Sequence, residues 1–119
     1  FACDGYVALV RERTLLEAVA SSLTEFFSPD LMTKRVLAWE KHYPWISKDT
    51  LDYFRTRPPR ARKDSLETID FVTQHATTYE PQARCVDALT RKTEILWHLL
   101  DSLYAAYVEP GWGPRGARA

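Results

Sequence analysis

The longest uninterrupted helical pattern in the sequence runs from Pro81 to Tyr107, and a charged residue falls inside its apolar stripe. Apolar side chains recur there at steps of three and four residues, as on one face of an α-helix. They are Cys85, Val86, Leu89, Leu96, Leu99, Leu100, Leu103, Tyr104 and Tyr107. Lys92 lies between Leu89 and Leu96, so its stem leaves from the face that packs into the core. We therefore expect a buried ammonium that needs an anionic partner.

Two interpretations of Lys92 stay open on this helix alone. The side chain can run along the edge of the stripe to water, or it can pair with a structural carboxylate. Alternatively, it points into a cavity where the anion belongs to a ligand. The rest of the chain has to decide between them.

Composition excludes several classes of protein. The 119 residues suit one domain, and 16 basic residues balance 16 acidic ones, so no overall field favours nucleic acid or an anionic membrane. No apolar run approaches the roughly 20 residues of a membrane span, and no signal peptide is recognisable. Cys3 and Cys85 belong to no C-x-x-C pair, which predicts two small buried side chains and no metal site. We expect a cytoplasmic protein.

Helix signals cover most of the chain. The expected helices span residues 2–27, 29–42, 48–57, 60–79 and 81–107. Ser28 and Ser47 stand where N-caps belong, and Pro58-Pro59 is expected to end or kink the third helix directly after Arg57. Residues 109–119, rich in proline and glycine, suit a flexible tail or linker. The sequence therefore predicts an all-α helical bundle over residues 1–108.

Charged side chains on these helices are candidates for a binding site. Tyr53 and Arg57 are four residues apart and share a helix face, and a guanidinium keeps its charge and fits carboxylates. Glu25 is read either as a solvated carboxylate or as part of a site. The basic cluster around Arg60 is expected to be a solvated face, because no nucleic-acid-binding motif accompanies it.

Five segments of the sequence resemble one family in order and in spacing. They are Phe1-Ala2-Cys3-Asp4-Gly5-Tyr6, Ser21-Ser22-Leu23-Thr24-Glu25-Phe26-Phe27, His42-Tyr43-Pro44-Trp45-Ile46, Tyr53-Phe54-Arg55-Thr56-Arg57 and Lys92-Thr93-Glu94-Ile95-Leu96-Trp97. Together, over nearly residues 1–107, they resemble the second half of the pyrroloquinoline-quinone synthase (PqqC) family. The resemblance implies a seven-helix, haem-oxygenase-like (thiaminase-II-like) fold and a homodimer. It also implies an oxidoreductase that closes a ring and oxidises a tricarboxylated quinone precursor with dioxygen.

The resemblance also assigns site residues. It implies that Tyr6, Glu25, Arg35, Tyr53, Arg57 and Lys92 line the substrate cavity. Tyr53 and Arg57 would act at the oxygen end of the site, and the three cations would hold the substrate carboxylates. The family uses no metal or redox cofactor, since pyrroloquinoline quinone is its product and O2 its co-substrate. Residues 109–119 resemble the linker that joins PqqC to the small PqqD domain in fused versions.

Two departures from the family pattern bear on function. A histidine of the family's oxygen site falls on Met32, whose thioether neither gives nor takes a proton. The family's first half, with further substrate contacts and the proposed general base, is not matched, so we expect at most half an active site. We also expect apolar faces to be left open, which favours self-association or domain swapping. Two alternatives remain: a non-catalytic dimerisation or scaffold module in which Lys92, Arg57 and Glu25 form buried ion pairs, and a haem-oxygenase-like relative acting on another small molecule.

Overall fold

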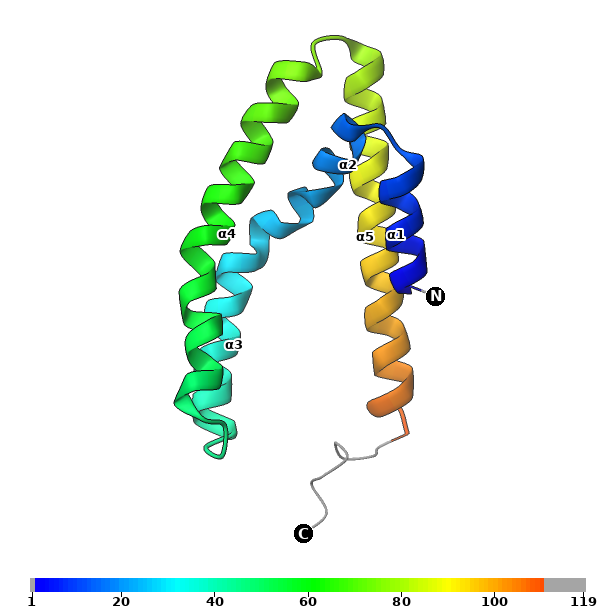
Figure 1. Ribbon diagram of the computed structural model, residues 1–119. Coiled ribbons are helices and arrows are strands. Elements are labelled where there is room, and N and C mark those ends of the chain that lie inside the picture. The colour runs from blue at the N-terminus through cyan, green and yellow to red at the C-terminus, as the bar shows by residue number, and fades with distance from the viewer. Residues whose placement is uncertain (1, 111–119) are drawn as a thin grey trace.

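The helices form two limbs that meet at one end, like an inverted letter V (Figure 1). The structure is a computed structural model that describes residues 2–110. Its elements are α1 (Ala2–Glu12), α2 (Leu15–Ser21), the 3-10 helix η1 (Ser22–Phe27), α3 (Ser28–His42), α4 (Lys48–His75) and α5 (Tyr79–Tyr107). Residues 2–110 contain no strand, which confirms the all-α prediction.

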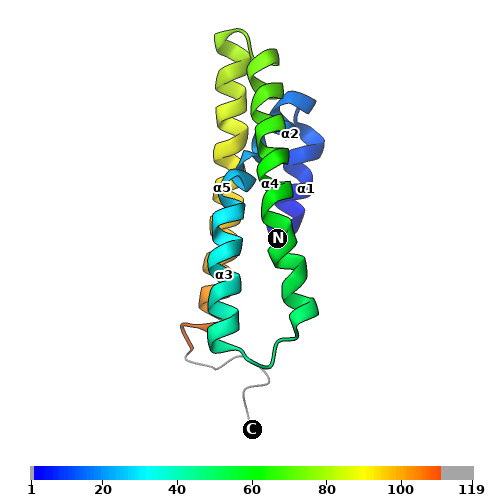
Figure 2. The ribbon, with the colours of Figure 1, turned by 90° about the vertical axis from the view of Figure 1, so that its left-hand side faces the viewer.

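Each limb is built from helices packed side by side. α3 lies against α4 in one limb, and α1 and α2 lie against α5 in the other, while η1 crosses between them. The limbs join where residues 76–78 link α4 to α5. Figure 2 shows the molecule edge-on, where its extents of 58 × 32 × 18 Å give a thin, open body. The radius of gyration is 17.6 Å, whereas a compact chain of this length has about 13.5 Å.

The first predicted helix is wrong as a single element, because it breaks at Arg13 and Thr14. Thr14 has extended backbone (φ −64°, ψ 160°) and caps α2: its hydroxyl accepts from the backbone N–H of Glu17, whose carboxylate accepts from the backbone N–H of Thr14. This reciprocal capping box favours a fresh helix start over continuation of α1. The chain then tightens into η1 at Ser22.

Proline does not end the third helix as predicted. α4 continues through Pro58 and Pro59, so Arg57 lies in its interior rather than at a C-terminus. Both prolines lack the N–H that would donate to the carbonyl four residues back. The two missing hydrogen bonds fall within one turn of α4, and α3 packs along this limb. The Ser47 cap is confirmed. Ser28 is not a cap, because η1 runs directly into α3 with helical backbone at Phe27.

The core of the described residues is small. Ala20, Ala76 and Cys85 form a buried cluster at the apex, with Leu16 and Val72 packed against it. The largest completely buried side chain within residues 2–110 is that of Ser21. Cys85 is buried as predicted, but the prediction for Cys3 was wrong because that residue is exposed on α1.

Apolar side chains remain uncovered on α5 away from the apex. We define the open face of α5 as the four side chains that continue the stripe beyond Lys92 and are between 36% and 53% exposed. They are Leu96, Leu99, Leu103 and Tyr107. The expectation of open apolar faces is therefore confirmed. None of the helices in residues 2–110 has the length and hydropathy needed to cross a bilayer, and most of the expected linker, from residue 111 on, lies outside the described residues.

Candidate functional site

Lys92 is buried on α5, and its ammonium faces an aromatic ring instead of a carboxylate. Only 5% of the residue is exposed. Its Nζ lies 2.7 Å from the ring centroid of Tyr6 on α1, a cation–π contact. Within residues 2–110, no carboxylate lies within ion-pair distance of this nitrogen. The structure thus brings two predicted site residues together and leaves the ammonium without an anion from the described chain.

The contact between Tyr6 and Lys92 follows from how α1 lies on α5. Gly5, the residue before Tyr6, faces Ile95: a Cβ placed on it would lie 3.9 Å from the isoleucine side chain, at ordinary van der Waals distance. Ile95 is three residues after Lys92 on the same helix face, so the contacts of Gly5 with Ile95 and of Tyr6 with Lys92 are neighbours along one interface between α1 and α5. The first turns of α1 therefore cover the middle of α5.

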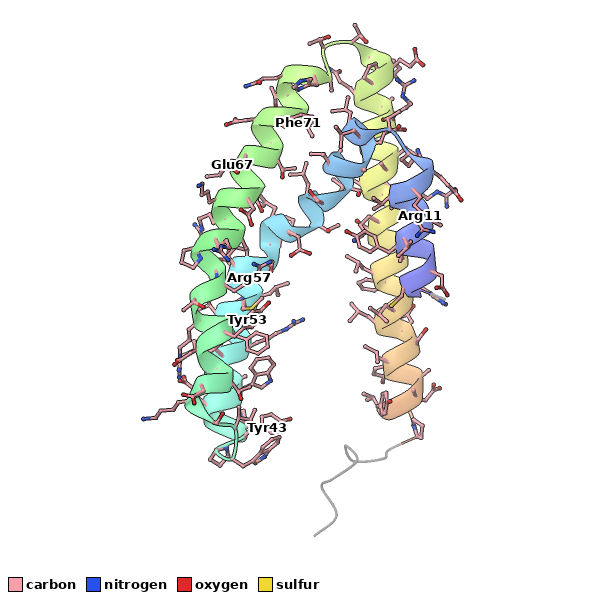
Figure 3. All side chains as sticks on the ribbon, viewed as in Figure 1. Arg11, Tyr43, Tyr53, Arg57, Glu67 and Phe71 are labelled. Carbon is pink, nitrogen blue, oxygen red and sulfur yellow. The ribbon has the colours of Figure 1, made fainter. Side chains whose placement is uncertain are left out.

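Three further predicted residues lie on the other limb. Arg35 is exposed on α3, and Tyr53 and Arg57 lie one turn apart on α4, where Arg57 is half-buried and Tyr53 is 60% exposed. Figure 3 labels Tyr53 and Arg57 on α4, on the limb opposite Arg11 of α1. The structure groups these three on one limb and keeps them apart from Tyr6 and Lys92.

Glu25 stands on η1, the segment that connects the two groups. Its side chain is exposed, as expected for a solvated carboxylate. Neither Glu25 nor Arg57 forms an ion pair with any other residue that the structure describes, and the same holds for Arg35. The scaffold alternative required buried ion pairs of Lys92, Arg57 and Glu25, and the described chain does not form them.

A buried carboxylate that sequence reasoning missed is Glu17. It is 5% exposed and accepts hydrogen bonds from the hydroxyl and the backbone N–H of Thr14 and from Arg13. The hydrogen bond from the Thr14 side chain is the largest cause that lowers the pKa of Glu17 below its usual value, ahead of the opposing effect of burial. The pattern Thr14-Leu15-Leu16-Glu17 is a capping-box signature, so the signal was present in the sequence.

An apolar pocket of about 320 Å³ opens at the apex. It lies between η1 and the ends of α4 and α5, and none of the six predicted site residues lines it. Cys85 stands in its wall, where burial, followed by the negative charge of Glu17, raises the pKa of the thiol. A protonated thiol among apolar side chains is a poor nucleophile, so this pocket is separate from the predicted chemistry.

The fold is that of an all-α helical protein. Comparison with known families shows which family the chain is related to. A sequence model of the TENA/THI-4/PQQC family matches residues 1–102. The chain therefore belongs to the TENA/THI-4/PQQC family, whose fold is the all-α, haem-oxygenase-like one that was predicted.

Curated relatives are similar along almost the whole chain. It is 51% identical over 117 residues to a bifunctional coenzyme PQQ synthesis protein C/D of Methylorubrum extorquens, covering 98% of this chain and 32% of that protein. It is 48% identical over 117 residues to a pyrroloquinoline-quinone synthase of Acidiphilium cryptum, covering 98% and 48%. A pyrroloquinoline-quinone synthase of Rhizobium meliloti is 47% identical, with 98% and 46% covered. The chain spans about a third to a half of the length of these relatives.

Proposed function

We propose that this chain supplies half of the active site of a pyrroloquinoline-quinone synthase. The reaction is the final step of pyrroloquinoline quinone biosynthesis, in which a tricarboxylated quinone precursor closes a ring and loses electrons and protons to dioxygen. The observation that carries the proposal is the buried ammonium of Lys92, which no carboxylate of the described chain neutralises. A buried cation costs free energy unless an anion compensates it, and a substrate carboxylate is that anion.

Arg35 and Arg57 complete the set of cations in this proposal. Both are free of ion pairs within residues 2–110 and so are available to bind the remaining carboxylates. In the proposal, Tyr6 and Glu25 line the substrate cavity together with these cations. Tyr53 and Arg57 act where dioxygen is reduced, with the guanidinium stabilising anionic oxygen species. The chemistry draws on no metal or redox cofactor, since the quinone precursor and O2 exchange the electrons directly.

The two limbs must approach each other for these residues to share one ligand. Tyr6 and Lys92 lie on one limb and Arg35, Tyr53 and Arg57 on the other. We infer that this closure comes with self-association, as a homodimer or a domain-swapped oligomer. The accessible surface of 9422 Å² supports this, because a compact chain of 13.8 kDa exposes about 6,600 Å². The difference is of the size that stable interfaces bury.

Location and partners follow from the same proposal. We place the chain in the cytoplasm, with a small quinone substrate and O2 as partners. Its similarity to a protein named C/D supports a functional link to a PqqD domain.

The test is an absorption titration of the folded chain with pyrroloquinoline quinone. We expect a saturable shift of the quinone spectrum, which weakens with salt because the recognition is electrostatic. The trimethyl ester of the quinone, which lacks the three negative charges, is the matched control and is expected not to bind. A helical chain that binds neither compound, or both equally, contradicts the proposal.

A second candidate function rests on Met32. This residue is half-buried on α3, where the family pattern has a histidine that handles protons during oxygen reduction. A relative that acts on another small molecule explains the exchange. Oxygen uptake with the quinone precursor, measured for the whole gene product with Met32 and with Met32→His, separates the two. Uptake by the unaltered gene product supports the synthase, and uptake by neither form favours the second candidate.

A further inference from the structure

The ring of Tyr6 lies against the ammonium of Lys92 and is itself partly exposed to solvent. The lysine is 5% exposed and the tyrosine 39%, while the nitrogen lies 2.7 Å from the ring centroid. Because the cation is buried and the ring against it is partly exposed, the ring is part of what separates the charge from water. An anion that binds Lys92 has to take the place of this ring.

The ring of Tyr6 is weakly held. Its hydroxyl has no hydrogen bond within residues 2–110, and Leu9 is the only buried residue of α1. The ring can therefore turn away by side-chain rotation without opening the core. A cation–π contact contributes about 0.5–2 kcal/mol, and charge-assisted hydrogen bonds to a carboxylate are stronger. An anion is thus able to displace it.

We propose that Tyr6 is a placeholder for the anion at Lys92 and controls access to it. Without substrate, the π face of the ring partly compensates the buried ammonium, which keeps the site intact. When a carboxylate arrives, the ring swings out and the ammonium pairs with the anion. The inference rests on the proposed function for the identity of the anion, but the covering of Lys92 by the ring is independent of it.

The placeholder favours ligands with several anionic groups. A single small anion gains one contact with Lys92 and loses the cation–π contact. A polycarboxylate gains further contacts with Arg35 and Arg57, which offset that loss. Tyr6 is in this sense a specificity-determining residue whose ring, and not its hydroxyl, carries the effect.

The test measures how fast an amine-acetylating reagent modifies Lys92, by mass spectrometry of the folded chain. Lys48, which is exposed on α4, gives the reference rate within the same sample. We expect Tyr6→Leu to raise the modification of Lys92 relative to Lys48 at least tenfold. Tyr6→Phe keeps the ring and is expected to leave the ratio unchanged.

A matched variant separates uncovering from loosening of α1. Val10 is 41% exposed one turn further along the same helix, so Val10→Ala shortens a similarly exposed apolar side chain and leaves the ring of Tyr6 in place. It is expected to leave the ratio unchanged. An unchanged ratio in Tyr6→Leu, a rise in Tyr6→Phe, or an equal rise in Val10→Ala would each overturn the placeholder.

Binding of pyrroloquinoline quinone then separates this inference from the proposed function. We expect the quinone to associate several-fold faster with Tyr6→Leu than with the unaltered chain or Tyr6→Phe in stopped-flow absorption. The expected modification pattern without any quinone binding keeps the placeholder and refutes the proposed function. Quinone binding with unchanged modification and association rates in Tyr6→Leu does the reverse.

Discussion

Arg13 ties the break between α1 and α2 to α5, because its Nη2 lies 2.7 Å from Oδ2 of Asp87. Its Nη1 lies 3.3 Å from Oε1 of Glu17, so one guanidinium bridges two carboxylates. Asp87 is half exposed, and ion pairs of this kind contribute about 0–1 kcal/mol. Glu17 is buried, so its hydrogen bonds contribute more to the free energy of unfolding than the exposed ion pair with Asp87 does.

Stability is expected to depend on the protonation of Glu17. Its pKa is lowered in the folded chain, so its contribution is present above the usual value of a glutamate and is lost as the pH falls through the lower, folded value. Glu17→Gln is expected to lower the free energy of unfolding by about 1–2 kcal/mol at pH 7 and to flatten its fall below about pH 4.5. Urea unfolding across this pH range measures both.

Glu12 provides the control for Glu17. It is exposed on α1, and Glu12→Gln is expected to leave both the free energy at pH 7 and its pH dependence nearly unchanged. A pH profile of Glu17→Gln that matches the unaltered chain would show that the capping box does not carry this dependence.

Gly5 is expected to lower the stability of α1, because glycine is a poor helix former and no close contact requires its small size. An alanine Cβ there would lie 3.9 Å from Ile95, which is ordinary van der Waals contact. Gly5→Ala is therefore expected to raise the free energy of unfolding by about 0.5–1 kcal/mol, because alanine loses less conformational entropy in a helix. Thermal unfolding by circular dichroism measures it. Ala8→Gly on the same helix is expected to shift stability in the opposite direction, and destabilisation by Gly5→Ala would mean that α1 and α5 lie closer than described.

Lys92→Met is expected to leave the chain equally stable or to stabilise it. Methionine fills similar space without a buried charge, and the change removes the desolvation cost together with one cation–π contact. Urea unfolding is expected to give a change within about 1 kcal/mol, or an increase. Arg91→Met, which breaks the exposed pair with Glu94, is the neighbouring control. A loss of about 3 kcal/mol or more in Lys92→Met would assign the lysine a structural role.

The open face of α5 is expected to drive self-association. Leu99 is 37% exposed in its centre, so Leu99→Glu places a charge where a second copy would bury it. Sedimentation equilibrium is expected to show a concentration-dependent oligomer that this variant dissociates. Thr90→Glu, also exposed on α5 but outside the open face, is expected to associate like the unaltered chain. Association that survives Leu99→Glu would place the interface elsewhere.

Helical periodicity predicted some elements well. The wrong predictions lie where a helix cap or a proline acts against the apolar pattern. The end of α5 at Tyr107 and the burial of Lys92 follow from one long apolar stripe. The break at Thr14 was missed because the apolar pattern continues across it, although Thr14 and Glu17 form a capping box. The predicted helices 48–57 and 60–79 are one element, because α4 runs through Pro58 and Pro59 while α3 packs against it.

The arrangement of the predicted site depends on contacts that periodicity does not encode. The pairing of Tyr6 with Lys92 arises because the chain breaks at Arg13 and Thr14, so that α1 and α2 each pack against α5, and periodicity did not predict this break. The separation of Arg35 and Arg57 from Lys92 arises because α3 pairs with α4 and not with α5. The resemblance named the six residues, and the structure divides them between two limbs and η1.

The most direct test of the account is the affinity of pyrroloquinoline quinone for the unaltered chain, Lys92→Met and Arg91→Met, measured by isothermal titration calorimetry. Loss of one charge-assisted contact is expected to weaken binding about 10- to 100-fold in Lys92→Met. Arg91→Met removes a positive charge from the adjacent, exposed position and is expected to bind like the unaltered chain. Equal affinity of Lys92→Met and the unaltered chain would contradict the claim that the buried ammonium belongs to a ligand anion.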